Sequence, residues 1–277
     1  MASLLALCGA ASWGAGDFLG GLASRRIAVV AVIAVSQAIG LVGVLLWVAA
    51  SGDPFPGVGK LLPAVGAGVA GAAGLAALYR GFAVGAMGIV APISAAAPTV
   101  PLAVDALHGT VPSSLQWLGI ALVLIGIATL SRERSAAAGS RTAAGAGLAV
   151  LAALGFGAFV VGIDAGADES ASWAVVAART ASVALAGTVA LTTGTPLRPP
   201  RRLLVTLVAV GVFDTAANIM VAAATTLGAA GIVAVLSALY PIVTVLLARL
   251  VLDERLSAAK RMGGVIAIAG AMLVAAG

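Results

Sequence analysis

A few charged side chains fall inside long apolar runs of this sequence, where they could do chemistry. Asp17, Arg179 and Asp214 lie well inside such runs, and Asn218 follows Asp214 by four residues, so the two share one helix face. An arginine can hold a carboxylate through paired hydrogen bonds, and an aspartate or asparagine can hold an amine. The sequence therefore suggests a site for a zwitterionic ligand, with Arg179 on its carboxylate and Asp214 or Asn218 on its amine.

Each of these charges also has a structural interpretation. Arg179 and Asp214 lie in neighbouring apolar runs, so they can form a buried salt bridge that fixes helix packing. Asp17 can bind a proton or an amino group, or it can pair with Arg80 or lie at the water boundary. The sequence leaves both interpretations open for all three charges.

The composition places these residues in a membrane protein. Of the 277 residues, 62% are hydrophobic and only 9% are charged, against roughly 25% charged in an average soluble domain. A soluble surface cannot be built from so few polar groups, which excludes disordered, nucleic-acid-binding and secreted disulfide-rich proteins. One cysteine, Cys8, allows no internal disulfide, and one histidine, His108, argues against a protein-only metal site.

The apolar runs divide the chain into about ten segments of membrane-spanning length, since a span needs about 20 residues. They show no alternation with period two, so we expect helices and an all-α membrane fold. The expected spans are 3–22, 29–50, 61–82, 87–106, 114–131, 143–163, 172–192, 203–224, 229–251 and 260–276.

The basic residues in the connections predict the orientation. Eleven Lys and Arg residues fall in the odd-numbered connections, and only Lys60 falls in an even-numbered one. Because basic residues concentrate on the cytoplasmic side, the odd connections should be cytoplasmic and both termini extracytoplasmic. We expect a multi-pass protein of the plasma (inner) membrane. The eleven are Arg25, Arg26, Arg132, Arg134, Arg141, Arg198, Arg201, Arg202, Arg255, Lys260 and Arg261.

The chain repeats itself at one constant offset. Residues 85–98 align with 228–241, and the same offset aligns Trp13-Gly14 with Phe156-Gly157 and Gly68 with Gly211. A charged cytoplasmic linker over 132–142 separates a first unit, 1–131, from a second, 143–277. Five spans per unit is an odd number, so the second unit enters the membrane from the opposite side. Inverted repeats of this kind are typical of secondary transporters, whose substrate site lies between the halves.

The repeat adds uncharged residues to the candidate site. Pro98 and Pro241 are equivalent and predict paired kinks or hinges near Ser94 and Ser237, whose hydroxyls can bind substrate or their own backbone. Aromatic residues make up only 4% of the chain, and we expect some of them to form walls or gates, or else to pack. These aromatic candidates are Trp13, its counterpart Phe156, Tyr79 and Tyr240.

Several motifs together resemble the EamA family of the drug/metabolite transporter superfamily. They are Trp13-Gly14, the segment 78–85 running into Val90-Ala91-Pro92 and Pro98, and a tail from Pro241 through 253–256 to Gly263-Gly264. The resemblance implies ten helices, with the first four of each half around a central cavity and the fifth packed behind. Family members include exporters of amino acids and other metabolites. The Gly-Glu often found after the fourth span reads Gly109-Thr110 here.

We therefore interpret the protein as a secondary transporter, most simply an exporter of amino acids or similar metabolites. A cationic-drug exporter using Asp17 and a sugar or nucleoside importer are alternatives, and an intramembrane enzyme or a channel is an alternative of another class. No phosphate-binding loop, nucleophile elbow or cysteine-pair metal signature occurs, so we expect no enzymatic activity and no cofactor. The expected partners are a small substrate and the lipid bilayer, with protons as a candidate coupling ion and no nucleic acid; the oligomeric state is left open.

Overall fold

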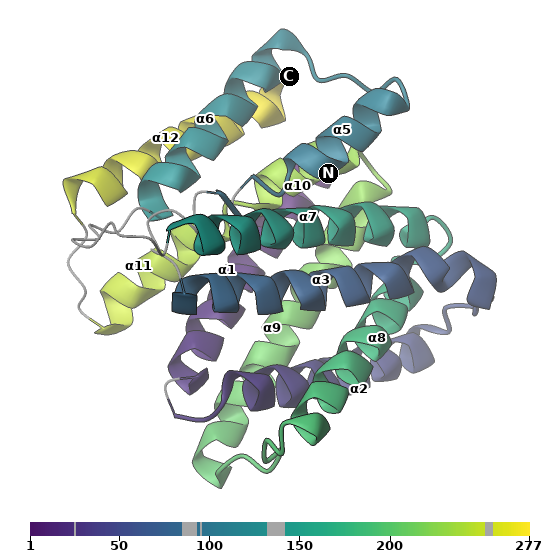
Figure 1. Ribbon diagram of the computed structural model, residues 1–277. Helices are drawn as coiled ribbons and strands as arrows, with labels where there is room; N and C mark the ends of the chain where they lie inside the picture. The colour runs from purple at the N-terminus through teal and green to yellow at the C-terminus, as the bar shows by residue number, and fades with distance from the viewer. Residues whose placement is uncertain (25, 85–92, 95, 132–141, 253–256) are drawn as a thin grey trace.

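The computed structural model describes all residues except 25, 85–92, 95, 132–141 and 253–256, and the described elements are all helices (Figure 1). The first half contains α1 (Ala2–Ser24), α2 (Val29–Ser51), α3 (Val58–Val84), α5 (Thr99–Leu107) and α6 (Ser114–Ser131). The second half contains α7 (Thr142–Ala167), α8 (Ala171–Thr192), α9 (Arg201–Thr225), α10 (Ala230–Ser237), α11 (Tyr240–Leu252) and α12 (Ala258–Ala276).

Seven of the described helices are long and apolar enough to cross a membrane: α1, α2, α3, α7, α8, α9 and α12. Each coincides with an expected span. Of the other three expected spans, the fifth is the shorter helix α6, the ninth is divided into α10 and α11, and only the end of the fourth, α5, is described in full. The chain is thus an all-helical, multi-pass membrane protein, and the count of ten spans stays a prediction.

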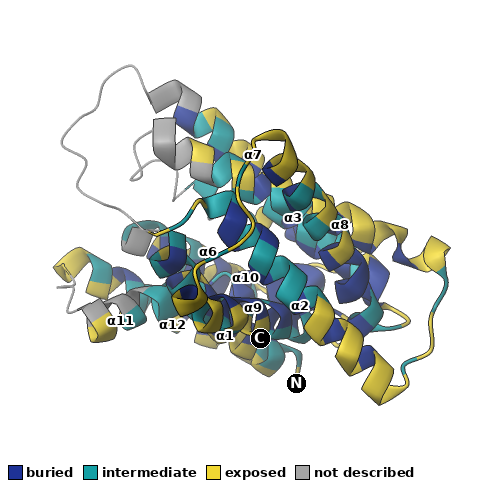
Figure 2. Cartoon of the chain, turned by 90° about the horizontal axis from the view of Figure 1, so that it is seen from below, coloured by how far each residue is buried: buried dark blue, intermediate teal, exposed yellow. Residues whose placement is uncertain are grey.

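The outer surface suits a lipid environment. Large apolar side chains on it are widely exposed, such as Leu46 at 66% and Val205 at 81%. Buried residues, drawn dark blue in Figure 2, lie on the inward faces of the helices, while exposed residues lie on the outer faces and in the connections. In water such a surface would be unstable, whereas acyl chains cover it without cost.

The main helix contacts join one half of the chain to the other. Helix α3 packs along α7, α1 along α9, α2 along α8 and α6 along α12 (Figure 1). In the sequence repeat, α1 is equivalent to α7 and α3 is equivalent to α9. The pair α3–α7 is therefore equivalent to the pair α9–α1. The pairs α2–α8 and α6–α12 map onto themselves. The two halves therefore interlock as a two-fold repeat, rather than folding as two separate bundles.

Single atoms follow the same repeat. A Cβ atom added at Gly14 would lie 2.6 Å from the carbonyl oxygen of Tyr240, and one added at Gly157 would lie 2.7 Å from that of Ala97. Gly14 and Gly157 are equivalent positions in the repeat, and so are Ala97 and Tyr240. Glycine is needed at both places, because any side chain would drive two helical segments apart.

The helix interruptions near the prolines are also equivalent. The Thr99 amide donates to the Ala96 carbonyl at 2.9 Å, and the Ile242 amide donates to the Leu239 carbonyl at 3.0 Å. Pro98 is the N-cap of α5 and Pro241 lies in the first turn of α11. Proline is tolerated at a helix start, because the first amides have no acceptor within the helix. The expected kinks thus take the form of a short turn between two helical segments.

The crossing of α6 and α12 gives a direct test of packing. A Cβ atom at Gly119 would lie 2.6 Å from the Gly270 carbonyl oxygen, and one at Gly270 would lie 2.6 Å from the Gly119 carbonyl oxygen. We expect Gly119→Ala or Gly270→Ala to lower the free energy of unfolding by about 1–3 kcal/mol, the usual cost of overpacking. Thermal unfolding in detergent measures this change.

The matched control is Gly43→Ala in α2, since a Cβ atom there meets nothing within 4 Å. It should leave the unfolding temperature unchanged or raise it, because alanine favours the helix over glycine. Equal unfolding temperatures for Gly119→Ala and Gly43→Ala would refute close packing at this crossing.

Candidate functional site

A cavity of about 540 Å³ lies where the two halves meet. Its lining comes from α1, α2, α3 and α6 of the first half and from α7, α8, α9, α10 and α11 of the second, together with residues beside the two helix interruptions. This volume falls within the range of cavities that hold small ligands, roughly 300–1,000 Å³. The walls are mainly apolar, and the few polar groups stand out against them.

Eleven of the twelve residues proposed for the site from the sequence line this cavity. The twelfth, Tyr79, belongs to α3, but its side chain is outside the described part of the structure. The eleven come from both halves: Trp13, Asp17, Ser94, Pro98, Phe156, Arg179, Asp214, Asn218, Ser237, Tyr240 and Pro241. Whether they bind substrate stays a prediction, but the fold gathers them around one space.

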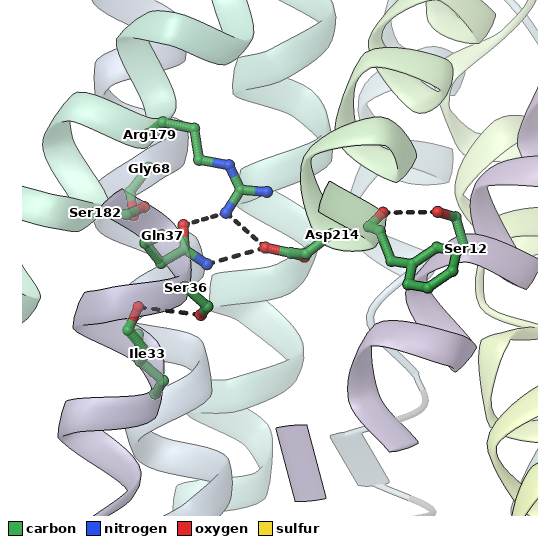
Figure 3. A network of polar contacts seen from close by, with 9 residues as sticks. Ser12, Ile33, Ser36, Gln37, Gly68, Arg179, Ser182 and Asp214 are labelled. Carbon is green, nitrogen blue, oxygen red and sulfur yellow. Dashed lines mark hydrogen bonds and ion pairs between the residues drawn. The ribbon is translucent and has the colours of Figure 1, made fainter. Parts of the chain in front are cut away.

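Three of the cavity's polar side chains form one network (Figure 3). The Arg179 Nη1 atom of α8 lies 2.5 Å from the Asp214 Oδ2 atom of α9 and also donates to the Gln37 Oε1 atom of α2. The Gln37 Nε2 group donates to the same Asp214 oxygen at 3.0 Å. The Arg179 side chain is only 4% exposed and that of Asp214 is 27% exposed. The buried salt bridge considered from the sequence is therefore formed, and Gln37 links its two partners.

Arg179 keeps hydrogen-bonding capacity outside this network. Its Nε and Nη2 groups are buried and have no hydrogen-bond partner among the described residues. Figure 3 shows Nη1 turned to Gln37 and Asp214, while these two nitrogens lie along another edge of the guanidinium. Two adjacent N–H groups on one guanidinium edge match the two oxygens of a carboxylate.

Gln37 is a residue that sequence reasoning missed. It carries no charge, so the search for charges within spans passed over it. The signal that could have found it is an amide in the middle of the apolar run 29–50. Burying an amide without a hydrogen-bond partner costs free energy, so such a residue indicates a polar contact.

Asp17 lines the same cavity and its side chain is exposed to it. The pairing with Arg80 considered from the sequence is not formed; Arg80 is exposed, and no basic residue in the described part of the chain makes an ion pair with Asp17. The charged residues in the described part of the cavity lining are thus Asp17, Arg179 and Asp214. Since the last two neutralise each other, Asp17 supplies one uncompensated negative charge.

Aromatic rings form part of the wall. The rings of Trp13 and Phe159 are tilted by 58° with centroids 6.4 Å apart, and both residues line the cavity. Phe156, which is equivalent to Trp13 in the repeat, also lines it and packs against Gly74 of α3. Trp13 thus contacts the aromatic residue one turn beyond its counterpart.

The two serines differ in their surroundings. Ser237 is 2% exposed, and its hydroxyl has no hydrogen-bond partner among the described residues. Ser94 is half-buried and is engaged by other groups. An unpartnered hydroxyl beside the α10–α11 interruption is a candidate contact for a polar ligand atom. The described residues contain no group of three or more His, Cys, Asp or Glu side chains that could hold a metal ion.

Comparisons with known proteins agree with the architecture. A crystal structure of a protein with 16% sequence identity superposes with a TM-score of 0.82, over 98% of this chain and 95% of the other, and this likeness shows a shared fold. No curated protein sequence matches significantly. The model of the EamA-like transporter family matches residues 1–132 and 143–276, once for each repeat. The chain belongs to the EamA-like transporter family.

Proposed function

We propose that the protein is a secondary transporter that exports amino acids or similar small metabolites by alternating access. Its family consists of membrane transporters. The observation that carries the proposal is the cavity between the repeats, which is lined by an uncompensated carboxylate, Asp17, and by an arginine, Arg179, that has two buried donors without a partner among the described residues. A zwitterion needs groups of both signs in one space.

The contacts of Asp214 support a different position for the amine from the one expected from the sequence. Asp214 forms an ion pair with Arg179 and accepts a hydrogen bond from Gln37, so its charge is already compensated. Asp17 is uncompensated and exposed to the cavity, which makes it the better partner for an ammonium group. In the proposed complex Asp17 holds the amine, and the Nε–Nη2 edge of Arg179 holds the carboxylate. Asn218 and Ser237 remain available for further polar atoms.

The apolar wall accounts for the rest of the substrate. Trp13, Phe156 and Phe159 offer ring surfaces that favour an apolar side chain. Small amphipathic metabolites therefore fit better than highly polar ones. This is the reason for preferring amino acids to sugars or nucleosides, which would need more hydrogen-bonding groups on the wall.

A cationic-drug exporter is the second candidate, and the uncompensated charge of Asp17 favours it. An organic cation would use Asp17 and the aromatic rings and would leave Arg179 to its structural salt bridge. The two candidates therefore differ in their dependence on Arg179. A channel or an intramembrane enzyme gains no support from the cavity.

We further propose that the protein resides in the plasma (inner) membrane with both termini outside and that protons drive transport, with Asp17 as their site. The excess of basic residues in the odd connections supports this orientation. A carboxylate exposed to the cavity can exchange a proton for an ammonium group, since the two compete for one negative charge.

Counterflow in proteoliposomes tests the carrier mechanism without assuming a driving gradient. Vesicles loaded with an unlabelled amino acid should transiently accumulate the labelled compound, and Asp17→Asn should reduce the initial rate at least tenfold because the ammonium loses its counter-charge. Asp168→Asn, which removes an exposed carboxylate just beyond α7, should leave the rate unchanged.

The panel should contain amino acids, organic cations and sugars. Accumulation of cations alone would replace the amino-acid assignment with the cationic-drug assignment, and a flat response across all three classes would refute transport of these classes. Uphill transport that survives collapse of the pH gradient would contradict proton coupling.

Arg179→Lys separates the carboxylate site from the salt bridge. A lysine ammonium can still pair with Asp214 but has no planar edge with two donors. Hydrogen bonds to charged groups contribute about 1.5–3 kcal/mol, so the wild type should bind an amino acid about tenfold or more tightly than its amide. In Arg179→Lys the ratio should fall to a few-fold, as measured by ligand-induced thermal shifts in detergent. An unchanged ratio would mean that Arg179 does not contact the substrate.

Asp214→Asn tests whether the network serves transport or only packing. Asparagine can still accept from Gln37 and Arg179, so the protein should remain folded in detergent. The guanidinium then lacks its counter-charge and should hold a substrate carboxylate too tightly for rapid release. We therefore expect the counterflow rate to fall at least fivefold, which corresponds to an increase in activation free energy on the order of 1 kcal/mol. A variant that loses stability but transports at the wild-type rate would assign the network to packing.

A further inference from the structure

Two short helices from different halves border the cavity. Residues at the cavity end of each helix line the space: Pro98, the N-cap of α5, and Ser237, the last residue of α10. From there α5 and α10 extend away from the cavity and pack against each other, with Leu102 of α5 and Val233 of α10 in one buried cluster. The far ends of both helices therefore meet beyond the cavity.

Among the described residues, one polar contact joins these far ends. The Gly231 amide, in the first turn of α10, donates a 2.6 Å hydrogen bond to the Asp105 Oδ2 atom of α5. The first amides of a helix have no acceptor within it and carry a partial positive charge, so a carboxylate is the acceptor that suits them. Asp105 thus connects the first half of the chain to the second through a charge-assisted hydrogen bond.

Glycine makes this contact possible. A Cβ atom at Gly231 would lie 2.7 Å from the Leu102 Cα atom, so only glycine lets the start of α10 come this close to α5. The contact between α5 and the start of α10, called the joint below, thus depends on two features. Gly231 allows the close approach sterically, and the Asp105 carboxylate attracts the start of α10 electrostatically.

The sequence repeat shows that the carboxylate of this contact occurs in one half only. Gly231 corresponds to Gly88 in the first half, so the glycine occurs in both halves. Asp105 corresponds to Ala248, so the carboxylate does not. In a carrier built from inverted repeats, one half rocks or gates against the other between the two access states, so contacts between the halves differ between these states. A contact that only one arrangement can make stabilises that arrangement over the other.

We propose that Asp105 is a latch: its hydrogen bond to the N-terminus of α10 holds the α5–α10 end of the cavity shut and sets the resting carrier in the state closed at this end. The inference rests on the alternating access of the proposed function, but not on the identity of the substrate. The latch must open in each transport cycle, so its contribution to the free-energy difference between the closed and open states has to be modest. A charge-assisted hydrogen bond changes an equilibrium constant by about 10- to 100-fold, which is strong enough to set a resting state and weak enough to break.

Spin-label distances across the joint test the latch directly. Leu107, at the end of α5, is 85% exposed, and Leu227, shortly before α10, is 57% exposed, so both accept labels without disturbing the core. The background is Cys8→Ser, because Cys8 is the sole native cysteine. Double electron–electron resonance on Leu107→Cys/Leu227→Cys in lipid nanodiscs then reports how far the joint opens, without any transport measurement.

With Asp105 present, we expect one dominant short-distance population. Asp105→Ala should lower the ratio of closed to open populations about tenfold or more. Asp105→Asn keeps an acceptor oxygen without the charge and should cause a smaller decrease. Gly231→Ala should open the same joint by its clash with Leu102. Asp168→Asn is the matched control, since Asp168 is an exposed carboxylate just beyond α7; it should leave the distances unchanged.

The outcomes are distinct. Unchanged distances in folded Asp105→Ala and Asp105→Asn would overturn the latch, as would an equal change in Asp168→Asn. Should Asp105→Ala fail to fold, Asp105→Asn decides alone. Opening of the joint without counterflow of any amino acid would support the latch while removing the substrate assignment, so the two proposals fail separately.

Discussion

Close backbone contact between the two halves is the constraint on which this structure depends. Lipid chains are as apolar as leucine, so burial of apolar side chains cannot hold membrane helices together as it does in water. Packing at small residues takes its place: Gly14 against Tyr240, its counterpart Gly157 against Ala97, and Gly119 against Gly270. Because these contacts run between the halves, the surface at which the halves meet is set by the backbone itself. The cavity lies at the part of that surface where the helices are interrupted and do not pack directly against each other.

The polar groups follow from this arrangement. Arg179, Gln37 and Asp214 come from three helices and satisfy one another in a space that the fold has removed from lipid. Buried ion pairs contribute little net stability, because desolvation offsets attraction, yet removing one partner is costly. The network therefore links α2, α8 and α9 without adding much net stability. Asp17 stands apart, since it faces the cavity with its charge uncompensated.

The sequence predicted the fold class, the repeat and the charged residues of the cavity lining, because each leaves a local pattern. Apolar runs indicate spans, and the constant offset of the repeat pairs Gly14 with Gly157 whatever the helices do in space. The partners of each charge left no such pattern. Gln37 was missed because a neutral amide looks ordinary without its neighbours, and the pairing of Asp17 with Arg80 was wrong because helix rotation decides which side chains meet. The division of the ninth span into α10 and α11 was expected only as a kink.

The interlocking of the halves has a consequence for biosynthesis. In the described part of the chain, the principal contacts of α1, α2 and α3 are with α7, α8 and α9 rather than with one another. When the ribosome has released only the first five helices, their glycine faces have no partners and lie against lipid. Folding of the bundle is thus a non-local event that waits for the second half of the chain, and the nascent first half depends on the membrane alone to hold its helices in place.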